Sequence, residues 1–114
     1  MSYRVARKTA CGQGHTHASK AEAKRCNELH LLERAGKIRL LTVEPTYHFY
    51  INGSTLMMSN GHKGRYRPDF TYIEGDRMVA EDVKPKNGLV EPDWPLRAAL
   101  FRHCYPDIEL RVIK

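Results

Sequence analysis

Three observations predict that this chain is an α/β layer fold in a single domain. Its 114 residues suffice for one hydrophobic core but not for two. Apolar patterns follow one another in the order helix, strand, two-stranded hairpin, helix, strand. Hydrophobic residues make up 41% and charged residues 28% of the chain, and no apolar run is long enough to cross a membrane. The sequence therefore predicts a soluble globular protein.

The positive charge is concentrated in the first third of the chain. Residues 1–39 hold nine Lys and Arg against three acidic residues, whereas residues 40–114 hold ten of each. We expect residues 1–18 to form a loose basic arm carrying Arg4, Arg7 and Lys8, and residues 19–114 to form the domain. Such a distribution favours a nucleic-acid partner. A solubilising tail is the alternative.

Four metal-ligating side chains occur near this arm: Cys11, His15, His17 and Cys26. Their spacing matches no common structural zinc pattern, so we favour phosphate contacts or solvent exposure for them over a zinc site. The three cysteines are an odd number without a Cys-x-x-Cys motif, which favours a reducing, intracellular setting.

A helix is predicted from Ser19 to Gly36. Ser19 and Glu22 form a capping-box pattern at its start, and Gly36 is a natural stop. The apolar face follows a 3–4 spacing through Cys26, Leu29 and Leu32, with Leu31 widening it. Glu22 has two possible roles, as a cap or as a carboxylate projecting toward the sheet. The sequence pattern alone favours the cap.

Residues 39–51 alternate between apolar and polar side chains and predict a strand that is bent, bulged or at a sheet edge at Pro45. Asn52-Gly53 predicts a hairpin turn into residues 54–58. The polar loop 59–64 then leads to Arg65 and Arg67. It is either a DNA-contacting loop or a plain surface loop.

The most informative stretch is residues 66–86, which predicts two strands joined at Gly75-Asp76 by a type II′ turn. With this turn, Asp69 lies directly opposite Asp82, and Lys84 shares their face. The other face receives the core side chains Phe70, Tyr72, Val79 and Val83. Opposed carboxylates repel each other at roughly 5 Å, and a hard divalent cation would relieve this repulsion. A turn one residue longer would instead separate the two acids.

A second helix is predicted to begin after Asp93 as its cap. Its expected buried face comprises Leu96, Ala99, Leu100 and His103/Cys104. Residues 108–113 alternate as a closing strand.

Pro68-Asp69 followed by Asp82-Val83-Lys84 resembles the PD-(D/E)XK nuclease signature. The chain is also similar to a family of small phage and prophage proteins of unknown function that resemble phage Holliday-junction resolvases. That likeness covers roughly Gly14 to the C-terminus and rests on segments 17–25, 31–38, 67–70, 81–84 and 96–101. It implies a restriction-endonuclease-like αβββαβ core, with a central mixed four-stranded sheet flanked by helices.

The resemblance also implies roles for individual residues. Glu22, Asp69 and Asp82 would bind Mg²⁺ or Mn²⁺, and Lys84 would be the catalytic lysine, so the resemblance reverses the preference for Glu22 as a cap. A metal-activated water would hydrolyse a DNA phosphodiester. The expected DNA-binding residues are Arg4, Arg7, Lys8, Lys20, Lys63, Arg65, Arg67, Lys86 and Arg97. Pro85 stands where the family often has glycine, which affects substrate fit more than the metal site.

The function expected from this resemblance is a magnesium-dependent, structure-selective DNA endonuclease of the Holliday-junction resolvase type. Cutting a two-fold symmetric junction evenly calls for a homodimer. The implied setting is the cytoplasm of a bacterial host, with a phage or prophage gene. A nuclease acting on flaps, nicks or general duplex is the first alternative. A DNA-binding recombination accessory protein without catalysis is the second.

Overall fold

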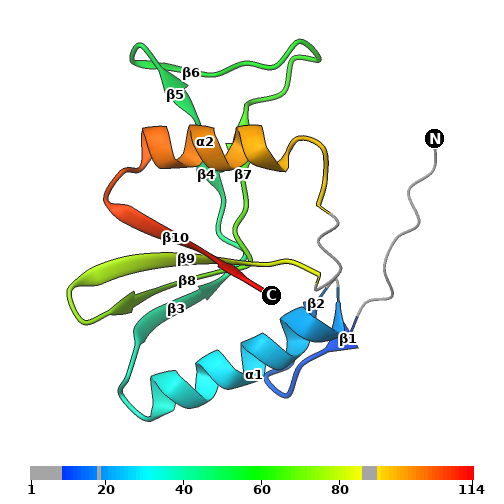
Figure 1. The fold of residues 1–114 in the computed structure, drawn as a ribbon, viewed down its shortest axis with the longest axis vertical. Coiled ribbons are helices and arrows are strands. Elements are labelled where there is room, and N and C mark those ends of the chain that lie inside the picture. The colour runs from blue at the N-terminus through cyan, green and yellow to red at the C-terminus, as the bar shows by residue number, and fades with distance from the viewer. Residues whose placement is uncertain (1–8, 18, 86–89) are drawn as a thin grey trace.

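The computed structural model describes residues 9–17, 19–85 and 90–114, and its centre is a four-stranded mixed sheet. The strands are β3 (Arg39–Val43), β8 (Phe70–Glu74), β9 (Arg77–Val83) and β10 (Ile108–Ile113), in the order β10-β9-β8-β3. β10 runs parallel to β9, and the other neighbours are antiparallel. Helix α1 (Lys20–Arg34) lies on one side of the sheet and α2 (Trp94–Cys104) on the other (Figure 1). The predicted α/β layers and element order are confirmed.

The hairpin at the centre of the sheet has the predicted register. Glu74 pairs with Arg77, and Gly75 supplies the positive φ of the turn at +66°. The ladder ends at the pair Phe70–Glu81, one position before Asp69 and Asp82. Asp69, just before β8, therefore lies beside Asp82 of β9, as the two-residue turn predicts.

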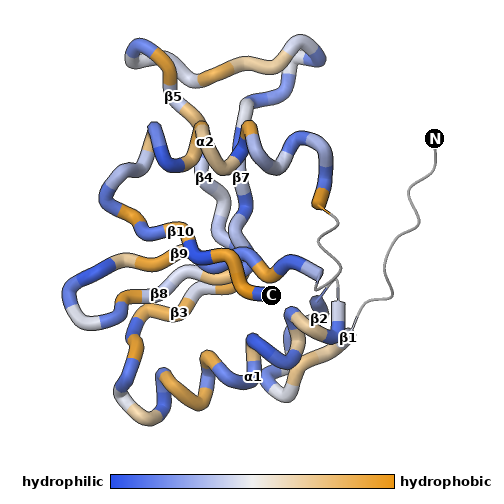
Figure 2. Tube along the Cα trace, in the orientation of Figure 1, coloured by the Kyte–Doolittle hydropathy of each residue, from blue (hydrophilic) through white to orange (hydrophobic). Residues whose placement is uncertain are grey.

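Alternate side chains of this hairpin pack into two separate hydrophobic cores, one on each face of the sheet. Phe70, Tyr72 and Val79 face α1 and pack with Cys26 and Leu29. On the other face, Ala80 packs with three aromatic residues: Phe49, Tyr66 and Phe101. In Figure 2, hydrophobic segments run along β9 and β10 through the middle of the molecule. Four consecutive residues of β9, at positions 79–82, are therefore buried, as in a strand that is covered on both faces.

Helix α1 begins and ends at the expected signals. The Ser19 hydroxyl accepts a hydrogen bond from the Glu22 amide (3.2 Å), which caps the first turn. At the other end, Gly36 has a φ of +76°, and the amide of Lys37 donates to the carbonyl of Leu32 (2.9 Å). The prediction that Leu31 widens the buried face is wrong, since its side chain is 60% exposed.

The stretch 39–51 is not the single strand that its alternation predicts. β3 ends at Val43, Glu44 takes a positive φ of 51°, and the chain leaves the central sheet near Pro45. It continues as β4 (Tyr47–His48), which pairs with β7 (Arg65–Tyr66), and as β5 (Tyr50–Ile51), which pairs with β6 (Ser54–Thr55). The predicted hairpin turn at Asn52-Gly53 is confirmed, and both residues have positive φ, as a type I′ turn requires.

Helix α2 starts where expected, but its buried face is different. Ala98 and Phe101 are buried, whereas Leu96 is 64% exposed and Ala99 is also exposed. Phe101 is held by ring contacts with Tyr47, Tyr66 and Tyr105. Tyr47 and Tyr66 come from distant parts of the chain, on β4 and β7, and their contacts with Phe101 set the rotation of the helix. Asp93 makes no side-chain cap bond and pairs with Arg97 instead (2.7 Å).

Residues 9–17 form a compact hairpin rather than part of a loose arm. β1 (Thr9–Ala10) pairs with β2 (Thr16–His17), and both strands contact α1. Cys11 and His17 are buried. The predicted DNA-binding residues Arg4, Arg7, Lys8 and Lys86 lie outside the described residues. Among the described helices, none is long and apolar enough to span a membrane.

Candidate active site

Three carboxylates and one lysine from separate elements line a single pocket. Glu22 comes from the first turn of α1, Asp69 precedes β8, Asp82 lies on β9, and Lys84 follows it. The pocket has a volume of about 450 Å³, and Trp94 of α2 also lines it. The structure thus brings together the four residues that the sequence analysis singled out for catalysis.

The β8–β9 hairpin fixes the position of Asp69 through its backbone and its side chain. The Asp69 amide donates to the carbonyl of Glu81 (2.9 Å), which extends the ladder by one bond. Its carboxylate oxygen Oδ2 accepts a hydrogen bond from the amide of Val83 (2.6 Å). Asp69 is therefore held against the strand that carries Asp82.

Asp82 and Lys84 form a nearly buried ion pair on the floor of the pocket. Their closest atoms, Oδ1 and Nζ, are 2.9 Å apart, and both side chains are 9% exposed. The other Asp82 oxygen accepts a hydrogen bond from the Tyr66 hydroxyl. The Lys84 ammonium also lies 3.8 Å from the centre of the Trp94 ring, a cation–π contact. These contacts hold the ammonium beside the carboxylates.

The acids in the pocket are not fully compensated by positive charge. Burial is the main reason that the pKa of Asp69 rises from 3.8 to about 8, and the charges of Glu22 and Asp82 add to this rise. The Val83 amide and Lys84 act in the opposite direction but do not overcome it. A site that disfavours its own ionised carboxylate is suited to bind an added cation.

The capping bond at the start of α1 joins the backbone amide of Glu22 to the Ser19 hydroxyl and does not involve the Glu22 carboxylate. The Glu22 side chain lines the pocket with Asp69 and Asp82, as the second alternative predicts. Its carboxylate also lies 3.9 Å from Nδ1 of the buried His17. The side chain, about 12% exposed, belongs to the site rather than to the helix surface.

Basic side chains surround the pocket entrance. Arg65, Arg67 and Arg97 line it, and Arg65 and Arg97 also line a neighbouring pocket of about 390 Å³. Lys63 lies in that second pocket, on the turn formed by residues 57–63. Lys20 is exposed at the start of α1 and lines neither pocket. Four of the five described DNA-binding candidates therefore lie around one continuous rim.

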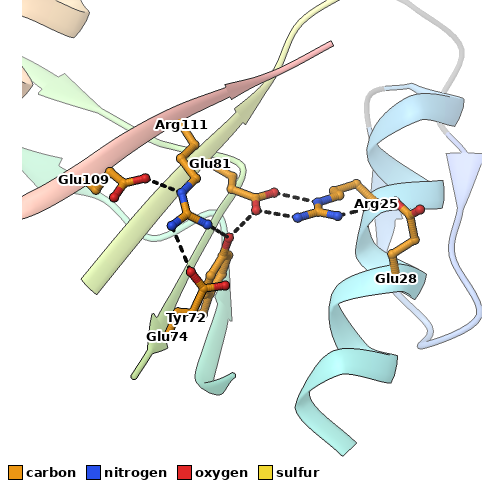
Figure 3. Close-up of polar contacts among 7 residues, drawn as sticks. All are labelled: Arg25, Glu28, Tyr72, Glu74, Glu81, Glu109 and Arg111. Atoms are coloured by element: carbon orange, nitrogen blue, oxygen red, sulfur yellow. Dashed lines mark hydrogen bonds and ion pairs between the residues drawn. The ribbon is translucent and has the colours of Figure 1, made fainter. Parts of the chain in front are cut away.

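Glu81, next to Asp82 in the sequence, points to the opposite face of the sheet. Its fully buried carboxylate accepts two hydrogen bonds from Arg25 (2.8 and 2.7 Å) and one from the Tyr72 hydroxyl. Arg111 bridges Tyr72 and Glu74 nearby (Figure 3). This network ties α1 to β8, β9 and β10, and it gives Glu81 a structural role outside the pocket.

The sequence analysis did not predict that Tyr66 and Trp94 line the pocket beside Asp82 and Lys84. Counting back along the hairpin would place Tyr66 on the α1 face with Phe70 and Tyr72. Instead, Tyr66 belongs to β7 and contacts Asp82, Trp94 and Phe101 on the α2 face. Pro68 separates β7 from β8, so the count does not carry across it. No local signal identifies Trp94 as the partner of Lys84.

The expectation for the cysteines and histidines is also wrong. We expected Cys11, His15, His17 and Cys26 to contact phosphate or solvent. The structure buries three of them, leaves His15 half-buried, and groups all four together. The cluster could not be recognised from sequence spacing, because it forms only when the β1–β2 hairpin packs against α1.

Comparison with known proteins gives a family but no activity. The family model described as "Protein of unknown function (DUF1064)" matches residues 1–114. No curated protein and no solved structure matches the chain.

Proposed function

The chain belongs to the DUF1064 family, and from the chemistry of its pocket we propose that it is a metal-dependent DNA endonuclease. One observation carries this proposal. Glu22, Asp69 and Asp82 converge from three elements on one pocket beside the ammonium of Lys84. Hydrolysis of a phosphodiester needs a cation at the phosphate and a neighbouring group that stabilises the added negative charge.

The donor set fits a hard divalent cation. Glu22, Asp69 and Asp82 offer carboxylate oxygens, the ligands that Mg²⁺ and Mn²⁺ prefer. The raised pKa of Asp69 supports this assignment, because a cation would offset the mutual repulsion of the acids. When bound, the ion would polarise a phosphate oxygen and favour the ionised form of an attacking water.

The protein groups around the acids are arranged for a phosphate ligand. Lys84 is held by Asp82 and by the Trp94 ring, so its ammonium has little freedom and needs little reordering on substrate binding. Tyr66 orients Asp82 from the other side. We assign to Lys84 the stabilisation of negative charge in the transition state. Its position two residues after Asp82 matches the order of the PD-(D/E)XK signature.

The basic rim suits a nucleic-acid backbone. Lys63, Arg65 and Arg97 form a surface that continues from the acidic pocket into the second pocket, and Arg67 flanks the first. Arg67 and Arg97 already pair with Glu44 and Asp93, whereas no ion pair is found for Arg65 among the described residues. Phosphate contacts from such a rim position DNA without reading its sequence.

The fold supports a restriction-endonuclease-like core. Ignoring the short pairs β1–β2, β4–β7 and β5–β6, the element order is α1, β3, β8, β9, α2, β10, which is αβββαβ. The central sheet is mixed and has a helix on each face. We therefore keep the junction-resolving type as the finer proposal, with a homodimer placing two sites on a two-fold symmetric junction. Flaps, nicks or general duplex are the alternative substrates.

The decisive assay compares DNA structures under controlled metal conditions. Labelled four-way junction, flap, nicked and linear duplex would be incubated with the protein in Mg²⁺, Mn²⁺ or EDTA. We expect symmetric cleavage of the four-way junction with either metal and none in EDTA. Cleavage of linear duplex alone would retain the nuclease and reject the resolvase. Binding to junctions without cleavage in any metal would favour the accessory-protein alternative.

Lys84→Ala sharpens the assay. Because Lys84 is assigned to the transition state, single-turnover cleavage at saturating DNA should fall about a hundredfold or more, with little change in Kd. The exposed Lys24 on α1 gives the matched control, Lys24→Ala, which should cleave at the wild-type rate. A Lys84→Ala rate within a fewfold of wild type would reduce Lys84 to a counter-ion of Asp82.

A further inference from the structure

A second cluster of metal-ligating side chains lies beside the first turn of α1, apart from the acidic pocket. It contains Cys11, His15, His17 and Cys26, and one ligand atom from each lies within 4.8 Å of those of the others. Cys11 and His15 flank the turn between β1 and β2, His17 ends β2, and Cys26 faces them from α1. Two elements of the fold are thus joined at one point.

The distances within the cluster are close to those of a tetrahedral site. Zn–S bonds of about 2.3 Å and Zn–N bonds of about 2.0 Å place ligand atoms about 3.3–3.8 Å apart around the ion. Nδ1 of His15 lies 3.4 Å from Sγ of Cys26. The full set, with all separations below 4.8 Å, needs only small side-chain shifts to reach these values.

The environment of the cluster also favours a bound metal ion. Nε2 of His17 is buried and has no hydrogen-bond partner among the described residues, although the side chain is only 1% exposed. An unpaired buried nitrogen is costly in a folded protein. The Cys11 sulfur accepts a hydrogen bond from the Gln13 amide (3.4 Å), a contact that favours a thiolate. His15 is half-buried, which leaves a route for an ion to enter.

We propose that Cys11, His15, His17 and Cys26 bind one Zn²⁺ as a structural Cys₂His₂ site. Two sulfurs and two imidazoles select zinc over the magnesium expected in the acidic pocket. Four protein ligands leave no open position for substrate, so the ion holds the β1–β2 hairpin against α1.

The zinc site also contacts the acidic pocket through one residue. His17 binds the ion through Nε2, which directs Nδ1 toward the Glu22 carboxylate, 3.9 Å away. Metal-bound histidines commonly donate their second N–H to a carboxylate, which orients both groups. The ion therefore helps to hold Glu22 in place, a consequence that rests on the proposed function, whereas zinc binding itself does not.

Metal content and cobalt spectroscopy test the site without any activity assay. Untagged protein, purified under reducing conditions and dialysed, should carry one zinc per chain by elemental analysis. Co²⁺ in place of zinc should give the strong visible bands of tetrahedral coordination and a sulfur-to-cobalt charge-transfer band. Cys11→Ser and His17→Asn should each lose zinc, and Cys104→Ser is the control because Cys104 is remote from the cluster, beside Tyr50.

Each outcome decides for or against the site. Zinc in the wild type and Cys104→Ser, with loss in Cys11→Ser and His17→Asn, supports it. Wild-type zinc no higher than that of Cys11→Ser, with no charge-transfer band, overturns it. A Cys11–Cys26 disulfide in protein purified without reductant, detected by mass and still zinc-free after reduction, also overturns it. Should the variants fail to fold, the wild-type zinc content and cobalt spectrum alone decide. A zinc-loaded protein that cleaves no DNA would reject the nuclease and retain the zinc site.

Discussion

Glu81 and Asp82 are neighbours on one strand, yet their surroundings differ in charge balance. The Glu81 carboxylate is fully buried but receives two hydrogen bonds from Arg25 and one from Tyr72. Asp82 lies on the other face, in a pocket where it meets Glu22, Asp69 and Lys84, with two further acids and three arginines also lining the pocket. Buried charges are tolerated when they are paired and bonded, as Glu81 is.

This difference distinguishes a structural acid from a candidate functional one. The negative charge of Glu81 is balanced by Arg25, so this carboxylate needs no added cation. In the pocket, burial raises the pKa of Asp69, and the charges of Glu22 and Asp82 raise it further, so its ionised carboxylate is only partly compensated. Sites that retain such an imbalance are candidates for binding an external cation. Four substitutions, each with a matched control, test this difference.

The largest effect is expected for Asp82→Asn. Loss of a carboxylate ligand should lower junction cleavage in Mg²⁺ by about a hundredfold or more, because a bound cation supplies several kcal/mol of transition-state stabilisation. DNA binding should be unchanged or tighter, since a negative charge near phosphate is removed. Asp76→Asn, at the exposed turn of the same hairpin, is the matched control. Wild-type cleavage by Asp82→Asn would reject the metal site.

The next effect is on stability, at the compensated network. Arg25→Ala leaves Glu81 without its charged partner and should lower the free energy of unfolding by about 3 kcal/mol. Urea denaturation of the metal-free protein measures the loss. Arg77→Ala breaks the exposed pair with Glu109 and should leave the urea midpoint near that of the wild type. Equal midpoints for Arg25→Ala and Arg77→Ala would show that Glu81 does not need Arg25.

Glu22→Gln separates the cap from the ligand. Glutamine retains the backbone amide that donates to Ser19 and also suits a capping box, so the Tm should remain near the wild-type value. It is a poorer ligand for a hard cation, and we expect cleavage to fall about tenfold to hundredfold. Glu28→Gln, exposed on the same helix, serves as the control. A lowered Tm with full cleavage would assign Glu22 to capping alone.

The smallest effect is expected at the rim. Arg65→Ala should weaken binding to every DNA structure by a similar factor and flatten the salt dependence by about one unit of slope. Binding titrations over a range of salt concentrations measure both quantities. Arg34→Ala, exposed at the far end of α1, should change neither. An unchanged slope in Arg65→Ala would remove the basic rim from the DNA-binding surface.

The features that could be predicted from the sequence are those fixed by local chemistry. Gly75-Asp76 sets the hairpin register and thereby places Asp69 beside Asp82. Ser19 and Gly36 set the ends of α1 through backbone hydrogen bonds within one turn. In each case the determining residues are neighbours in the chain.

The features that could not be predicted depend on distant contacts. Leu40 and Glu44 have positive φ values, and β3 departs from regular strand geometry at these residues. Leucine and glutamate do not favour positive φ, so the sequence gives no sign of this departure. The rotation of α2 depends on aromatic residues from β4 and β7. The hydrogen bond between Tyr66 and Asp82 joins residues that are distant in the sequence. The cluster of Cys11, His15, His17 and Cys26 likewise forms only when the β1–β2 hairpin packs against α1.

We expect the acids of the pocket to bind an added cation, whereas Glu81 is already compensated by Arg25. Comparing Asp69→Asn with Glu81→Gln in two assays tests this difference. One is a Mn²⁺ titration followed by electron paramagnetic resonance, and the other is thermal unfolding in EDTA at pH 8. The folded-state pKa of Asp69, about 8, exceeds its ordinary 3.8, so its contribution to stability is lost as pH rises between these values.

We therefore predict that Asp69→Asn raises the Tm in EDTA at pH 8 and loses Mn²⁺ binding. Glu81→Gln should lower the Tm, because Arg25 loses its charged partner, and should bind Mn²⁺ as the wild type does. The opposite pattern, with Mn²⁺ binding lost in Glu81→Gln and retained in Asp69→Asn, would contradict the account.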